Sequence, residues 1–227
     1  MTEDLYRLAI DALRHHLRQA GVPFSEDDGD LVVARHRLGL SIAFDGFEYQ
    51  SGQTIAPLDI GIHLDGDTGD RFRVGTLGIG SDPLKAMEAG IAEWHLLAAA
   101  PVLAALGAEA GSRKRDQAPR KLAGWDLFPG RVGVRGAIPA GLQAGGAFFL
   151  TLLKAIHQFV SSWEAPTHFQ LRTIFIMATV ADGKPEVQAA VDGFVNQELA
   201  DALAALPWPQ GAEAYLYKQL FVLRGNE

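Results

Sequence analysis

The glycine-rich segment Gly75–Asp82 is the part of the sequence whose residue types are best suited to holding a ligand. Strand-like residues run into Ser81, Asp82 and Pro83, a typical helix start, because serine or aspartate caps a helix and proline fits its first position. The free N–H groups and the positive dipole end of a helix bind phosphate or carboxylate, and glycines let the ligand approach closely. We therefore expect an anion-binding site here, with Gly78, Gly80 and Ser81 as its ligand-binding residues.

Three departures from known phosphate-binding motifs weaken this interpretation. The glycine spacing is not G-x-G-x-x-G, and no Gly-Lys-Ser/Thr sequence follows it. Asp82 also places a negative charge where an anion would bind. A capped helix after a tightly packed strand explains the same residues without any ligand.

A second group of residues offers acid–base or metal chemistry: His63, Asp65, Glu88 and His95. His63 and Asp65 are two apart on an expected strand and so share a face. Glu88 and His95 are seven apart on an expected helix and also share a face. The residues after Asp65 do not follow the order of a calcium loop and equally suit a solvated turn, so we predict no metal site. An enzyme would require the four side chains to meet in one pocket.

Several classes of catalytic site are excluded by what the sequence lacks. It has no cysteine, which excludes thiol nucleophiles, disulfides and thiolate-bound zinc or iron–sulfur clusters. No serine lies in a G-x-S-x-G motif, and no H-E-x-x-H sequence is present. Binding is therefore favoured over catalysis, and we expect no cofactor.

Charge is distributed unevenly along the 227 residues, whose formal net charge is −7. Residues 1–107 carry 8 basic and 16 acidic residues, residues 108–124 carry 5 and 2, and residues 125–227 carry 7 and 9. The acidic first half favours a protein partner with a basic surface and disfavours nucleic acid. The basic cluster lacks interleaved aromatic residues and is interpreted as a solvated connector; it comprises Arg113, Lys114, Arg115, Arg120 and Lys121.

No targeting or membrane segment is recognisable. The sequence begins Met-Thr-Glu-Asp, which is the wrong charge for a secretory signal. The longest run without charge, Gly136–Leu153, has 18 residues but contains Pro139 and several glycines, so it falls short of the roughly 20 apolar residues that span a bilayer. We expect a cytoplasmic protein that binds neither membranes nor nucleic acid.

The first half, residues 1–107, is predicted to have the element order α-β-β-β-β-α. A helix begins after Thr2, ends before Gly21 and carries an apolar stripe at helical spacing. Phe24–Asp30 is predicted to be an acidic turn. The four strands that follow are separated by glycine- and aspartate-rich breakers: Leu31–His36, Leu40–Glu48, Leu58–Asp65 and Phe72–Ile79. The closing helix begins at Ser81.

The second half, residues 125–227, follows the basic connector 108–124 and is predicted to be β-β-α-β-β-α-β. Turns are expected at Pro129-Gly130 and Asp182-Gly183, each between two strands. A buried helix spans about 143–163, with His157 partly buried, and Asn196 caps a short helix. The last strand, 214–223, is apolar on both faces and so belongs in the interior of a sheet. This order predicts an α+β fold of mostly antiparallel sheets with helices packed on them, in two α+β halves that are either separate or one compact domain.

Short motifs across most of the chain resemble an uncharacterised bacterial family, a domain of unknown function. The resemblance rests on the run Gly90–His95 ahead of Ala100-Pro101, on Gly124-Trp125 with Val134–Gly136, and on the closing Leu206–Pro209. It implies a bacterial protein of about this length. It implies no activity and no catalytic residue.

Three functions remain open from the sequence. The first is a non-catalytic cytoplasmic interaction or regulatory protein, for example an immunity-type protein, whose acidic N-terminal half binds a basic partner. The second is a small-molecule or anion-binding protein that uses Gly75–Asp82. The third is an enzyme with an acid–base or metal site at His63, Asp65, Glu88 and His95.

Overall fold

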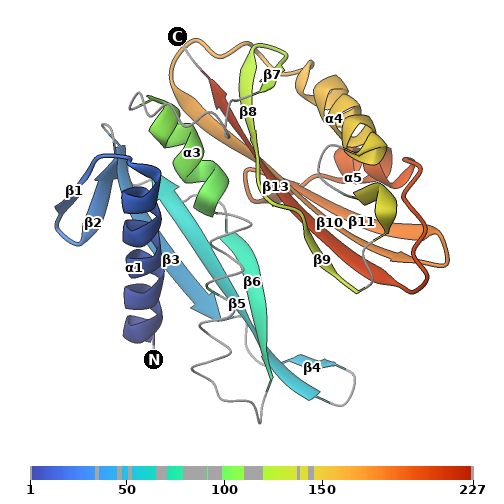
Figure 1. Cartoon of the computed structure of the whole chain (residues 1–227), viewed down its shortest axis with the longest axis horizontal. Coiled ribbons are helices and arrows are strands. Elements are labelled where there is room, and N and C mark those ends of the chain that lie inside the picture. Colours follow the sequence, from blue (N-terminus) through green and yellow to red (C-terminus); the bar gives the residue numbers. More distant parts are fainter. Residues whose placement is uncertain are drawn as a thin grey trace. The chain divides into compact units, whose positions relative to one another are not determined.

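The computed structural model describes residues 2–33, 36–44, 48–50, 53–64, 71–78, 91, 99–109, 120–136, 139–142 and 146–225. The chain forms two compact units, residues 1–116 and 117–227. Each unit contains one antiparallel sheet and helices, which confirms the predicted α+β class (Figure 1).

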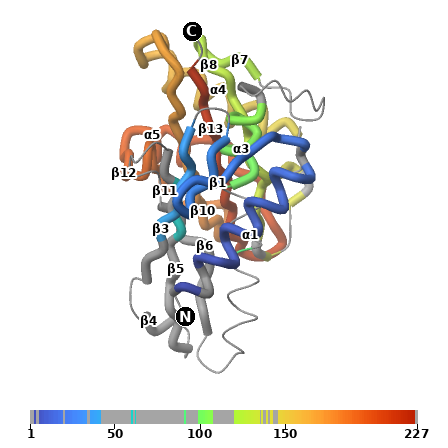
Figure 2. Tube along the Cα trace, turned by 90° about the vertical axis from the view of Figure 1, so that its left-hand side faces the viewer, coloured from blue at the N-terminus to red at the C-terminus, as the bar shows by residue number. Residues whose placement is uncertain are grey.

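The first unit contains a sheet with the strand order β1-β2-β3-β5-β4, in which β6 also pairs with β5. Its elements are α1 (Thr2–Ala20), β1 (Phe24–Asp27), β2 (Asp30–Val33), β3 (His36–Phe44), β4 (Glu48–Gln50), β5 (Gln53–Leu64), β6 (Arg71–Gly78) and α3 (Ala100–Glu109). Helix α1 packs against β3 (Figure 2). The apolar stripe of α1 is buried, and so are residues of one sheet face: Ala9, Ile10, Leu13 and Leu17 of the helix, and Leu31, Val33 and Leu38 of the sheet.

The end of α1 follows the sequence prediction. Gly21 has a φ of 66°, the left-handed conformation that glycine adopts without strain. Its N–H donates to the carbonyl of Arg18 at 3.1 Å, and the N–H of Val22 donates to the carbonyl of Leu17 at 3.0 Å. This pair of hydrogen bonds is a Schellman motif, which reverses the chain after the helix and directs it into β1.

The predicted acidic turn over Phe24–Asp30 is wrong, because most of it is strand. Residues 24–27 form β1, and only Asp28 and Gly29 form the turn before β2. Both turn residues have positive φ, 52° and 88°. This is the two-residue turn that Asp-Gly favours in hairpins. The described residues of the first unit therefore form six strands, where four were predicted.

The predicted helix that begins at Ser81 lies outside the described residues, apart from Ile91, which is helical and buried. The described helix of this region is α3. Pro101 lies in its first turn, where the missing N–H needs no partner, so the proline does not interrupt it. The helix continues past Gly107 to Glu109.

The second unit contains a sheet with the strand order β12-β11-β10-β13-β8-β7, in which β9 also pairs with β13. Its elements are β7 (Arg120–Leu122), β8 (Trp125–Pro129), β9 (Gly133–Arg135), the 3₁₀ helix η3 (Ala140–Leu142), α4 (Ala147–Val160), β10 (Gln170–Ala181), β11 (Lys184–Val191), β12 (Phe194–Val195), α5 (Gln197–Ala204) and β13 (Tyr215–Gly225). The core combines one face of the sheet with buried residues of α4 and α5.

Several predictions for this unit are confirmed. Asp182 and Gly183 have positive φ and join β10 to β11. The Asn196 side chain accepts a hydrogen bond from the N–H of Leu199 at 2.9 Å and so caps α5. Strand β13 lies between β10 and the pair β8 and β9, inside the sheet. His157, however, is exposed on α4, because only the Leu153, Ile156 and Val160 side of the helix faces the core.

The predicted hairpin at Pro129-Gly130 is wrong. Strands β8 and β9 do not pair with each other; both pair with β13, one after the other along its length. Gly130, between them, donates its N–H to the carbonyl of Leu220 at 2.7 Å. The hairpin of this region is β7–β8, whose turn residues Ala123 and Gly124 have positive φ.

The connector predicted at residues 108–124 is shorter than expected, because both of its ends belong to regular elements. Its last residues, Arg120–Leu122, are strand β7 of the second unit, and Gly107–Glu109 belong to α3. Residues 110–119 lie outside the described residues. Lys121 forms an ion pair with Asp126 on β8, and its side chain is nevertheless 73% exposed, so this basic residue is solvated although it lies on a strand.

A buried polar network lies at Gly130, between β8 and β9, where the pairing with β13 is interrupted. Gln219 of β13 is only 1% exposed. Its side-chain amide donates to the carbonyl of Gly130 at 2.9 Å, and its carbonyl accepts from the hydroxyl of Tyr217. The network satisfies a backbone carbonyl that the interrupted ladder leaves inside the core.

We predict that Tyr217→Phe lowers the free energy of unfolding by about 1–3 kcal/mol at pH 7, because the amide carbonyl of Gln219 loses its donor. Burial raises the pKa of Tyr217. The stability that its neutral hydroxyl provides is therefore complete below about pH 10 and lost above it. Urea denaturation from pH 7 to 11 should show the wild-type and variant stabilities converging as the pH rises. A constant difference between them would contradict this role of the hydroxyl.

Candidate functional site

The glycine-rich candidate site lies only partly in the described structure. Gly75 and Gly78 belong to β6, where they pair with Leu58 and Ile55 of β5. Gly80 and Ser81 lie outside the described residues. The anion-binding site therefore stays a prediction.

The acid–base candidates also lie mostly outside the described residues. His63 lies on β5 and pairs with Gly39 of β3. Asp65, Glu88 and His95 lie outside the described residues, so their convergence stays a hypothesis. Within the described residues, no group of three or more His, Asp or Glu side chains is placed to hold a metal ion.

The hairpin formed by β1 and β2, residues 24–33, is the charged feature that the structure defines best. We call it the acidic hairpin. It contains four carboxylates, Glu26, Asp27, Asp28 and Asp30, and no basic residue. Residues 25–29 are exposed. The positive φ values of its two-residue turn fix the strand register, in which Asp27 pairs with Asp30.

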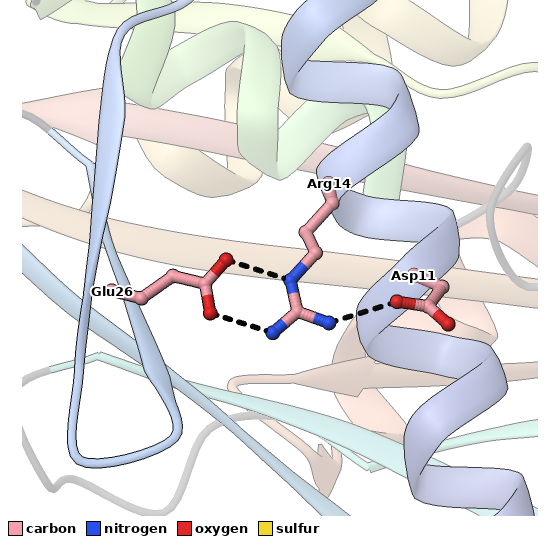
Figure 3. Close-up of polar contacts among 3 residues, drawn as sticks. All are labelled: Asp11, Arg14 and Glu26. Atoms are coloured by element: carbon pink, nitrogen blue, oxygen red, sulfur yellow. Dashed lines mark hydrogen bonds and ion pairs between the residues drawn. The ribbon is translucent and has the colours of Figure 1, made fainter.

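Arg14 of α1 holds this hairpin on one side (Figure 3). Its Nε and Nη2 atoms donate to the two carboxylate oxygens of Glu26 at 3.0 and 2.8 Å, and its Nη1 donates to Asp11 at 2.8 Å. These hydrogen bonds, first to Glu26 and then to Asp11, raise the pKa of Arg14. Because the bond to Glu26 is bidentate, it fixes the orientation of the carboxylate as well as its distance.

Arg37 of β3 pairs with carboxylates on the opposite face of the hairpin. Its guanidinium contacts Asp27 and lies 3.6 Å from a carboxylate oxygen of Asp30. The Asp30 side chain lies over Gly39, since a Cβ at Gly39 would be 3.3 Å from its Oδ1. Burial, and next the negative charge of Asp30, raise the pKa of Tyr6 on α1, while Arg14 lowers it.

The arginines compensate only part of the charge, and Arg14 is less exposed than the two carboxylates that it holds. The Arg14 side chain is 24% exposed, against 47% for Glu26 and 59% for Asp11. Together with Asp11, the hairpin presents five carboxylates against three guanidinium groups, because Arg18 of α1 lies over the Phe24 ring, 5.7 Å from its centroid; the net charge is −2. Asp11, Glu26, Asp27 and Asp28 are exposed, and so are Arg18 and Arg37.

The uneven charge of the sequence coincides with the division into two units. Residues 1–116 hold 18 acidic and 11 basic residues, whereas residues 117–227 hold 9 of each. The first unit thus carries the entire net charge of −7. The acidic hairpin lies in the unit that attracts basic partners.

Two exposed apolar residues were not predicted. Phe194 and Val195 of β12 are 80% and 83% exposed. They are consecutive on a strand, so they point to opposite faces of the sheet and do not form one apolar patch. The Asp192-Gly193 sequence before them is a turn signal that the sequence analysis did not use.

Among the helices that the structure describes, none is long and apolar enough to cross a membrane. Comparison with known proteins identifies a family: residues 26–225 match the model of a family of unknown function, DUF6348. No curated protein and no solved structure matches the chain.

We predict that Arg14→Met lowers the free energy of unfolding by at most about 1 kcal/mol at low salt, because Glu26 and Asp11 lose a shared, partly exposed cation. The loss should shrink at about 1 M salt, where the Debye length is roughly 3 Å. Lys154→Met is the control, since Lys154 is an exposed residue of α4 with no ion pair among the described residues. Urea denaturation of both variants at two salt concentrations tests this. Equal, salt-independent losses would contradict the stabilising role of Arg14.

Proposed function

We propose that this chain, which belongs to the DUF6348 family of unknown function, is a non-catalytic cytoplasmic protein that binds a basic protein surface through its acidic hairpin. One observation carries the proposal: Arg14 fixes the Glu26 carboxylate of the hairpin in place with two hydrogen bonds, yet Glu26 is more exposed than Arg14. An acidic surface whose positions are fixed is a recognition surface rather than only a solubilising one.

The fixed geometry supports binding in two ways. A carboxylate already held by a guanidinium loses little side-chain entropy when a partner arrives. The uncompensated charge of the hairpin, and the net charge of the whole first unit, attract a basic partner during diffusion and raise the association rate. Like charge repels phosphate, so the same surface disfavours nucleic acid.

A bacterial regulatory or immunity-type protein would use such a surface to cover a basic region of its target. In that role the hairpin supplies selectivity, because partners without basic charge at matching positions leave carboxylates desolvated and unpaired. In this proposal the second unit serves as a structural scaffold.

The proposal predicts that neutralising the hairpin slows association with the partner. In Asp27→Asn/Asp28→Asn, asparagine keeps the positive φ of position 28 accessible and leaves Arg37 paired with Asp30. The control, Glu186→Gln/Glu198→Gln, removes two exposed carboxylates from the second unit. Partners captured from the native host should associate about tenfold more slowly with the first variant at low salt, and unchanged with the control.

Salt provides the second arm of this experiment. Binding to the unmodified protein should weaken steeply between low and high salt, because surface charges are screened. A captured partner that binds independently of salt and equally to both variants would overturn the proposal, and so would the absence of any partner.

A further inference from the structure

Strand β1 is an edge of its sheet. It is the first strand in the order, and among the strands that the structure describes it pairs with β2 alone. Asp27 and Asp30 flank the two-residue turn, which makes them a hydrogen-bonded pair, and hydrogen-bonded pairs alternate along an antiparallel ladder. The N–H and C=O groups of Ser25 and Asp27 therefore point to β2, whereas those of Phe24 and Glu26 point away from it.

The outward groups of this edge are accessible. In the part of the chain that the structure describes, no backbone hydrogen bond joins Phe24 or Glu26 to another element. Ser25, Glu26 and Asp27 are exposed. The edge thus offers two donors and two acceptors, the groups that an added strand uses.

The charges along this edge select which strand can be added. A second copy of the chain would bring like charges face to face, and like charges directly opposite are destabilising. Natural edge strands are commonly protected from self-association in this way. A basic strand meets no such barrier, so the same carboxylates exclude self-pairing and favour a basic partner.

The side-chain positions define the pattern of that strand. Glu26 points to the face that α1 covers, as its hydrogen bonds with Arg14 show, and Asp27 points to the opposite face, where Arg37 lies. Side chains of an added strand also alternate between the two faces. A basic residue on the Asp27 face would therefore reach that carboxylate, whereas on the α1 face both oxygens of Glu26 are already bonded to Arg14 and Arg18 lies over Phe24.

We infer that the partner docks by adding an extended basic segment as a strand alongside β1, with backbone hydrogen bonds to Phe24 and Glu26. This inference rests on the proposed function and specifies how that partner is recognised. Backbone pairing supplies the direction and register of the segment, and the carboxylates supply its charge preference.

The test uses the full-length protein and a blocked synthetic peptide of lysine, arginine, threonine and valine. A second peptide has the same sequence with alternate backbone nitrogens methylated, which keeps every charge and removes edge hydrogen bonds. We expect the methylated peptide to bind at least about tenfold more weakly in calorimetric titration at low salt. In hydrogen exchange, the unmodified peptide should protect the amides of Phe24 and Glu26.

Two variants provide an independent arm. Glu26→Gln removes the carboxylate and keeps the N–H, whereas Glu26→Pro also removes the outward N–H, at an edge position where proline is tolerated. Glu26→Pro should bind the unmodified peptide about fivefold more weakly than Glu26→Gln. Circular dichroism shows whether both variants are folded. If Glu26→Pro is not folded, the comparison of the two peptides provides the test.

The outcomes separate this inference from the proposed function. Equal, salt-sensitive binding of both peptides, without protection of Phe24 and Glu26, would overturn strand addition and leave electrostatic recognition by the hairpin intact. Absence of binding by either peptide at low salt would overturn both.

Discussion

The bidentate hydrogen bonds between Arg14 and Glu26 hold the acidic hairpin against α1, and the proposed recognition surface depends on them. Without this cation, Glu26 and Asp11 would repel each other across the helix and the strand. With it, both carboxylates are fixed and still reach solvent. The burial of Leu13 and Leu17 positions the helix, so apolar packing determines where the arginine lies and the arginine determines where the carboxylates point.

Both units have partly exposed ion pairs, and the second unit also has a polar network in its core. In the first unit, the described ion pairs lie at the surface, where charge remains available to a partner. In the second, Gln219 and Tyr217 pair within the core, and their contribution is to close an interruption in the sheet. The net charge follows the same division, which is why we assign recognition to the first unit and a scaffold role to the second.

Local signals predicted the parts of the fold that depend on neighbouring residues. Gly21 ended α1, Asp182-Gly183 formed a turn and Asn196 capped α5, as expected. The two errors have different causes. Gly130 is held by Gln219, 89 residues away, and no local signal indicates that partner. The strand at Phe24–Asp27 pairs with β2 through the local Asp28-Gly29 turn, a hairpin signal that the prediction of an acidic turn overlooked. The sequence predicted an acidic turn at these residues. That arginines hold the carboxylates in fixed positions is visible only in the structure. Gly80, Ser81, Asp65, Glu88 and His95 lie outside the described residues.

Site-specific photo-crosslinking in the native host tests most directly whether the acidic hairpin is the recognition surface. Ser25 is exposed beside Glu26, and a photoreactive residue there would lie at the proposed interface; Lys154, exposed on α4, serves as the reference position. We expect a discrete crosslinked protein from position 25 that disappears at high salt, and none from position 154. The same products from both positions, or a product from position 154 only, would contradict it.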